Sequence, residues 1–100
     1  MKKRNYEDDL LDRLKDNDYA IDYLNAVLED PSADLQVRFL IALRAVAKAH
    51  GFSKMAKDSS LNRESLYKLL SENGNPELKS LFSILHSLDL VIQIKYKKAS

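Results

Sequence analysis

Residues 52–70 read FSKMAKDSSLNRESLYKLL, and this segment decides the fold that the sequence predicts. Two short helical patterns meet at a brief interruption. Ala56 is small enough to let one helix approach another closely. Leu61, Leu66 and Leu69 return to one helical face, while polar residues occupy the others. This arrangement is typical of a helix-turn-helix whose second helix presents polar groups to a groove of DNA.

Length and composition narrow the class of protein. The 100 residues suffice for one domain, and only two Gly and two Pro favour helices over turn-rich β structure. The absence of Cys excludes disulfides and thiol catalysis and argues against a zinc finger. The sequence holds neither an apolar run of the roughly 18 residues that span a bilayer nor a signal-peptide core. We therefore expect a cytoplasmic protein without a membrane partner.

Charge is distributed unevenly. Residues 1–34 hold 5 Lys/Arg and 10 Asp/Glu, whereas residues 35–100 hold 11 Lys/Arg and 5 Asp/Glu. The positive second part contains the helix-turn-helix candidate and suits a phosphate backbone. The alternative is that the charges of a small protein simply fluctuate along the chain.

Apolar periodicity predicts further helices before this pair. We expect helices at 6–15 and 18–29, separated by a cluster of N-cap residues. Ser32 is expected to cap a third helix, which Gly51 ends, because Gly suits the position after a helix. This longest helix should be the scaffold of the domain.

The pair itself is expected at 54–58 and 63–71. A loop signal over residues 72–76 precedes a sixth helix, which should begin near Pro76 because Pro is tolerated in a first turn. The apolar residues of the sixth helix that we expect to be buried are Leu78, Leu81, Phe82, Leu85 and Leu88.

After Asp89 the apolar period changes from about 3.6 to 2, which predicts a β-strand. A lone strand leaves backbone groups unpaired, so we expect two copies to pair antiparallel in a homodimer. The alternatives are a seventh helix or a frayed tail. The dimerisation residues would be Leu90, Ile92, Ile94 and Tyr96.

The sequence lacks the usual signs of catalysis. His50 and His86 each stand alone, without a Cys or a second His at metal-binding spacing, and no phosphate loop or nucleophile motif occurs. The acids of residues 7–34 are spaced like the outer faces of helices. We interpret the chain as a binding protein and not an enzyme, with no metal, cofactor or small-molecule substrate.

The quoted segment resembles the phage-repressor-like helix-turn-helix, of the Xre or Cro/CI type, at Ala56, Leu61, Leu66, Tyr67 and Leu69. One departure is Ser60, where the family usually has Gly. A fuller resemblance covers residues 18–94 and is to HigA-like antitoxins of addiction modules, often called probable prophage antitoxins. The runs that carry it are 23–24, 29–30, 39–40, 42–44, 47–51 and 65–71, with Pro76 and Leu81.

The resemblance implies an all-α, lambda-repressor-like bundle of five to six helices, usually dimeric, to which the apolar pattern adds the C-terminal β-strand that pairs across the dimer. We expect one compact domain with an acidic helical region at 1–31, a DNA-binding part at 32–89 and a strand with a basic tail at 90–100. The resemblance also implies an antitoxin that neutralises a RelE-, ParE- or HigB-type toxin and represses its own operon. The alternative is a stand-alone phage-type repressor without a toxin.

The expected contacts to an operator in double-stranded DNA come from the helix-turn-helix. Arg63 can read guanine, Glu64 can accept from cytosine, and Tyr67 and Lys68 are better placed for phosphates. The alternative is a merely solvated helix face. The predicted DNA-binding residues are Ser53, Lys54, Asn62, Arg63, Glu64, Ser65, Tyr67 and Lys68.

The acidic N-terminal region is the expected surface for a toxin, since the resemblance implies a basic partner that acids would steer. The alternative is that these acids only keep the protein soluble. The predicted toxin-binding residues are Asp8, Asp9, Asp12, Asp16 and Asp22.

Overall fold

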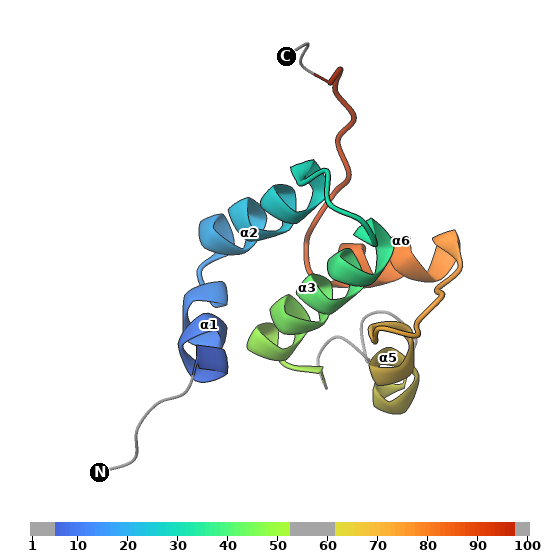
Figure 1. Cartoon of the computed structure of the whole chain (residues 1–100). Helices are drawn as coiled ribbons and strands as arrows, with labels where there is room; N and C mark the ends of the chain where they lie inside the picture. The colour runs from blue at the N-terminus through green and yellow to red at the C-terminus, as the bar shows by residue number, and fades with distance from the viewer. Residues whose placement is uncertain (1–5, 53–61, 98–100) are drawn as a thin grey trace.

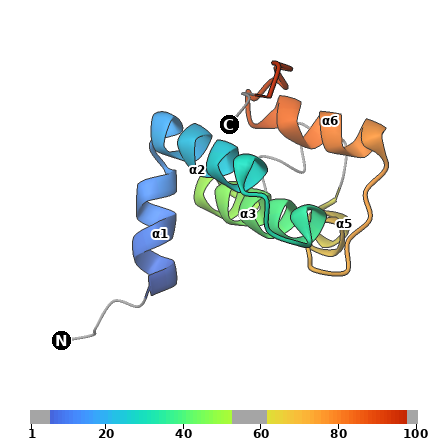
Figure 2. The same cartoon turned by 45° about the horizontal axis from the view of Figure 1, so that its top comes forward.

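A computed structural model describes residues 6–52 and 62–97, which form five helices and no strand (Figure 1). Helix α3 lies at the centre, with α1 and α2 on one side and α5 and α6 on the other (Figures 1 and 2). This arrangement is compatible with the predicted all-α class. The helices are α1 (Tyr6–Leu14), α2 (Asn17–Glu29), α3 (Leu35–His50), α5 (Arg63–Leu69) and α6 (Leu78–Ser87).

The predictions for the turn of the helix-turn-helix lie outside the described residues. They concern the helix at 54–58, the turn at Ser60 and the DNA contacts of Ser53 and Lys54. Of the described helices, none is both long enough and apolar enough to cross a membrane.

The hydrophobic core gathers along α3, as the predicted scaffold role requires. Leu43 of α3 is fully buried, and Leu14, Leu66 and Ile84 bring fully buried side chains from α1, α5 and α6. Burying a side chain of this size contributes about 1.5–3 kcal/mol. One helix therefore organises apolar contacts from both sides of the molecule.

The break between α1 and α2 is the predicted capping site. Asp16 is the N-cap of α2, and its Oδ1 accepts hydrogen bonds from the backbone N–H groups of Asp18 at 2.9 Å and Tyr19 at 3.4 Å. Such a cap satisfies donors that have no partner within the helix.

The predicted cap of α3 is wrong. The helix begins at Leu35 after Asp34, which has a φ of 61° and makes no capping hydrogen bond with its side chain. The Ser32 hydroxyl instead donates to Asp30 Oδ1 at 2.6 Å. Ser32 thus stabilises the turn that precedes the helix, and its side chain is engaged there.

The predicted buried stripe of α6 is wrong at two positions. Leu78 and Phe82 are 63% and 48% exposed, whereas Ile84 is fully buried. Leu78 and Phe82 are four positions apart and share one side of α6, and this side is not the one that packs on the core. The buried face therefore comprises Leu81, Ile84, Leu85 and Leu88.

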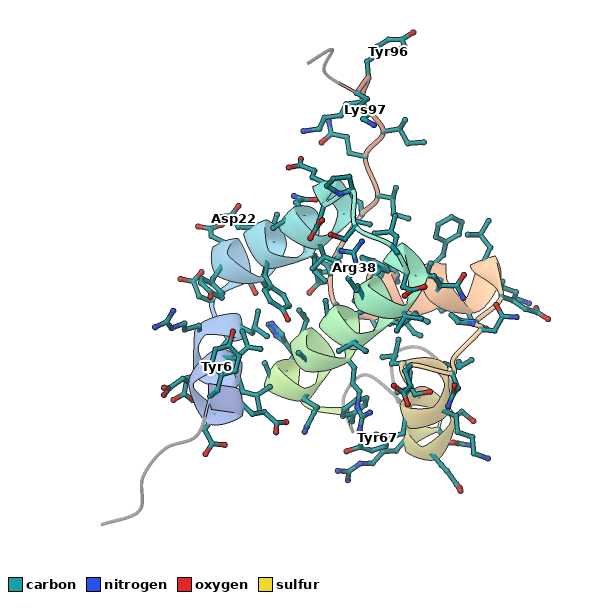
Figure 3. The ribbon with its side chains drawn as sticks, in the orientation of Figure 1. Tyr6, Asp22, Arg38, Tyr67, Tyr96 and Lys97 are labelled. Carbon is teal, nitrogen blue, oxygen red and sulfur yellow. The ribbon has the colours of Figure 1, made fainter. Side chains whose placement is uncertain are left out.

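The C-terminal segment leaves the bundle past the end of α2, and Tyr96 and Lys97 project beyond that helix (Figures 1 and 3). Leu90 packs against the core, while Ile94 and Tyr96 are 91% and 100% exposed. Lys95 Nζ lies 3.6 Å from Glu29 Oε1 of α2. The structure holds one copy of the chain, so a strand that pairs across a dimer stays a prediction.

Candidate functional site

Helix α5 is fixed on the core by its apolar side. Leu66 and its C-cap Leu70 are both fully buried. At the other end, Asn62 Oδ1 accepts a hydrogen bond from the backbone N–H of Ser65 at 2.7 Å. This cap and these anchors hold the polar side of α5 outward.

Six of the predicted DNA-binding residues lie in the described part of the chain, and α5 brings them together. Asn62, Arg63, Glu64 and Lys68 are exposed, whereas Ser65 and Tyr67 are half-buried. One short helix and its N-cap carry all six, so they lie close together, although they do not all point to the same side of the helix. Tyr67 was predicted to contact phosphates, but its ring is packed against other side chains and is not freely exposed.

The ring of Tyr67 lies between α3 and α5 (Figure 3). It stacks on the buried ring of Phe52, with centroids 4.4 Å apart and ring planes at 25°. The guanidinium carbons of Arg44 and Arg63 lie 5.3 Å and 5.8 Å from its centroid. We call Arg44, Phe52, Arg63 and Tyr67 the arginine–aromatic cluster. Each such cation–π contact contributes about 0.5–1 kcal/mol at an exposed site.

Arg44 is not among the residues that the sequence predicted for this surface. Arg44 belongs to α3, 23 positions before Tyr67 along the chain. Apolar periodicity places Arg44 off the buried face of its helix but does not show which helix lies opposite. The only feature of the sequence that could have indicated Arg44 is that it is a basic residue off the buried face of the scaffold helix.

The predicted toxin-binding acids lie on the other side of α3, on α1 and α2 (Figure 3). All of them are exposed. Asp16 also has a structural role as the α2 cap, and Asp12 Oδ1 lies 3.4 Å from Lys15 Nζ. Asp22 projects from the outer side of α2. The acids are therefore gathered on one side of the molecule, where Asp8, Asp9, Asp12 and Asp16 also have partners within the chain.

An ion pair joins this acidic side to the scaffold helix. Lys48 Nζ of α3 donates to Glu7 Oε1 of α1 at 2.7 Å. The hydrogen bond from Lys48, with its positive charge, lowers the pKa of Glu7 below its ordinary value of 4.5. Sequence reasoning missed this pair because 41 positions separate its members.

The described residues contain no group of three or more His, Asp or Glu side chains that could hold a metal ion.

A groove runs between α2 and the C-terminal segment. Its apolar lining includes Ile21, Leu24, Leu28, Phe39, Leu90 and Ile92.

Comparison with known proteins identifies the family. Residues 5–96 match the family model described as "Probable addiction module antidote protein". The chain belongs to this family. Membership supports an antitoxin role and implies a cognate toxin as a partner. The antitoxin also resembles an uncharacterized protein of Haemophilus influenzae, with 34% identity over 76 residues, which are 76% of this chain and 75% of the relative. No solved structure matches the chain.

Proposed function

We propose that this antitoxin binds operator DNA through α5, represses its own operon and neutralises a toxin of the RelE, ParE or HigB type. The observation that carries the DNA-binding part is the polar surface of α5. Leu66 anchors the helix on the core while Arg63, Glu64 and Lys68 are exposed beside one another. A helix held by one face with charged and amide groups on the other is suited to a major groove.

The residues of α5 divide between base edges and phosphates. Arg63 would donate to O6 and N7 of guanine, and Glu64 would accept from N4 of cytosine. Asn62 Oδ1 is engaged by the helix cap, which leaves its amide N–H groups as the donors available to a base. Lys68, near the far end of the helix, would contact the phosphate backbone.

The test is a gel-shift titration on the duplex upstream of the antitoxin gene. Replacing Arg63 and Lys68 together by Ala should weaken operator binding at least tenfold, since a base contact contributes about 1–3 kcal/mol. The control variant, Arg13→Ala with Lys15→Ala, removes the same charge from the last turn of α1 and the residue that follows the helix, across the molecule (Figure 1). Equal affinities of wild type and the α5 variant would show that DNA does not bind this surface.

The proposal includes a homodimer, because two copies would present α5 to two half-sites about one helical turn apart. Val91 and Ile94 provide a matched test, since both are about nine-tenths exposed and lie on opposite sides of the predicted strand. Ile94→Lys should shift the sedimentation coefficient toward the monomer, whereas Val91→Lys should not. The same sedimentation change in both variants would contradict this pairing.

The toxin would contact the acidic side formed by α1 and α2. Truncation is unsuitable as a test, because Leu14, Ala20 and Leu24 of these helices belong to the core. Co-expression with the product of the neighbouring gene, followed by pull-down, should instead show weaker capture by a variant with three acids neutralised, Asp8→Asn, Asp9→Asn and Asp22→Asn.

The control for this pull-down removes three exposed carboxylates from elsewhere on the molecule, by Glu72→Gln, Glu77→Gln and Asp89→Asn. Equal capture of both variants and wild type would place the toxin on another surface. No capture of the neighbouring product by wild type would favour the stand-alone repressor.

A further inference from the structure

The arginine–aromatic cluster gathers positive charge from two helices. Arg44 of α3 and Arg63 of α5 both lie over the ring of Tyr67. Their guanidinium groups are therefore close to one another, because both are close to the same ring. Across residues 6–52 and 62–97, no carboxylate oxygen lies within 4.0 Å of either guanidinium. The cluster therefore has two cations without a direct ion pair in the described chain, although the charge of Arg44 also contributes to the lowered pKa of Glu7 on α1.

The positive charges of Arg44 and Arg63 repel one another, and the Tyr67 ring offsets part of this repulsion. The negative face of an aromatic ring attracts cations, and the stacking of Phe52 fixes the orientation of this ring. The side chains are thus held in place before any ligand arrives. A bound anion would relieve the remaining repulsion, because it attracts both guanidinium groups, which are suited to phosphate oxygens.

We propose that Arg44, from the scaffold helix, contacts a phosphate of the DNA backbone beside α5, and that Tyr67 sets its position relative to Arg63. This inference rests on the proposed binding of DNA by α5. It assigns two different tasks to the paired arginines. Arg63 discriminates between bases, whereas Arg44 binds the backbone of any sequence.

The tasks predict different salt dependences. Each phosphate that a protein neutralises adds about 0.9 to the slope of log affinity against log salt concentration. Removing Arg44 should lower that slope by about 1 and weaken operator and scrambled duplexes by similar factors. The ratio of wild-type to Arg44→Ala affinity should therefore fall roughly threefold between 50 and 200 mM salt.

The experiment measures binding of full-length protein to a fluorescent operator duplex and to a scrambled duplex across this salt range. Arg44→Lys restores the charge without the planar fork, so it should recover most of the slope that Arg44→Ala loses. Tyr67→Leu removes the ring that orients Arg44 and should weaken binding to both duplexes. Arg13→Ala, which removes an arginine from α1, should leave the slope unchanged.

Two outcomes would overturn this assignment. One is an unchanged slope and affinity for Arg44→Ala in a protein whose operator binding still depends on Arg63. The other is a loss confined to the operator, which would make Arg44 a base-reading residue. In both cases the proposed function would stand. If wild type binds neither duplex, the proposed function itself fails.

Discussion

Two connections meet the N-terminal half of α3, and they are stabilised in different ways. The α2–α3 connection, residues 30–34, is held by hydrogen bonds from one arginine side chain. The α5–α6 connection, residues 70–77, depends on the close approach of two stretches of backbone. If the arginine is lost, water can replace some of the hydrogen bonds of the α2–α3 connection. In the α5–α6 connection nothing can make room for a side chain where two stretches of backbone touch. We therefore expect the two connections to differ in their tolerance of substitution.

Arg38 holds the α2–α3 connection. Its Nε donates to the carbonyl of Ala33 at 3.0 Å, and Nη2 donates to the carbonyl of Ser32 at 2.7 Å. Longer hydrogen bonds reach the carbonyls of Val27 at 3.4 Å and Asp30 at 3.3 Å. One planar guanidinium thus satisfies carbonyls from the end of α2 and from the turn that follows it.

Gly74 determines the α5–α6 connection. A Cβ at this position would collide with the carbonyl oxygen of Leu69 and lie 2.8 Å from its carbonyl carbon. The backbone N–H of Gly74 donates to the carbonyl of Ser71 at 2.9 Å. Gln36 Nε2 of α3 lies 3.5 Å from the carbonyl oxygen of Gly74. Glycine is required here because backbone atoms occupy the space of a side chain.

The largest expected effect is therefore that of Gly74→Ala. The collision with Leu69 forces the backbone to shift, and we expect a loss of about 3 kcal/mol in the free energy of unfolding. Gly51→Ala is the matched control, since Gly51 has a φ of 91° but, apart from its two chain neighbours, no other residue of 6–52 and 62–97 has an atom within 4 Å of a Cβ added there. That backbone conformation alone should cost an alanine about 1 kcal/mol. Urea unfolding measures both values.

Equal losses for the two glycine variants would mean that the α5–α6 connection relaxes easily. The α5–α6 connection would then tolerate a side chain at Gly74, and the expected difference in tolerance between the two connections would be wrong.

Local patterns in the sequence predicted the helices well. The bounds of α1, α2 and α5 agree with the predicted ranges to within two residues. Repeated apolar spacing and capping residues act within a few positions of one another, so they can be read directly. The predicted cap at Ser32 is wrong because α3 begins only at Leu35, after Asp34 in the left-handed conformation, and the Ser32 hydroxyl donates to Asp30 instead.

Contacts between distant positions could not be predicted in the same way. Arg38 reaches back to Val27, Glu7 pairs with Lys48, and Arg44 lies over the ring of Tyr67. Periodicity shows which side of a helix faces the core but not which helix lies opposite the other side. For the candidate site, the sequence thus indicated the residues of α5 but not the arginine that α3 adds.

Arg38→Met should have an intermediate effect. Met retains much of the apolar stem but none of the hydrogen bonds, and the carbonyls in this exposed turn can be hydrated. We expect a loss of about 1–2 kcal/mol in the free energy of unfolding. Arg38→Lys should recover little, because an ammonium group cannot reproduce the fork of a guanidinium. Differential scanning calorimetry, with Arg13→Met as the control for charge, measures these differences.

A loss larger than that of Gly74→Ala would reverse the expected order of the connections. Full recovery by Arg38→Lys would show that positive charge, and not the geometry of the fork, stabilises the turn.

The smallest effect concerns Asp30, in the same turn. The hydroxyl of Ser32, followed by its backbone N–H, lowers the pKa of Asp30 below its ordinary value of 3.8. An acid with a lowered pKa in the folded state stabilises the fold above its unfolded pKa, and this contribution disappears as the pH falls through the folded pKa. Ser32→Ala should therefore reduce stability slightly at neutral pH and leave it unchanged at a pH below the folded pKa of Asp30.

A carbon-detected NMR titration of the Asp30 carboxyl group measures this change directly. In Ser32→Ala the pKa of Asp30 should rise toward 3.8, although the backbone N–H of residue 32 remains as a donor at 2.9 Å. Ser87→Ala is the control, because the hydroxyl of Ser87 donates to the carbonyl of Ile84 and not to a carboxylate. An unchanged Asp30 titration in Ser32→Ala would mean that this side-chain hydrogen bond does not stabilise the ionised acid. Arg38 would then be the main polar support of the connection.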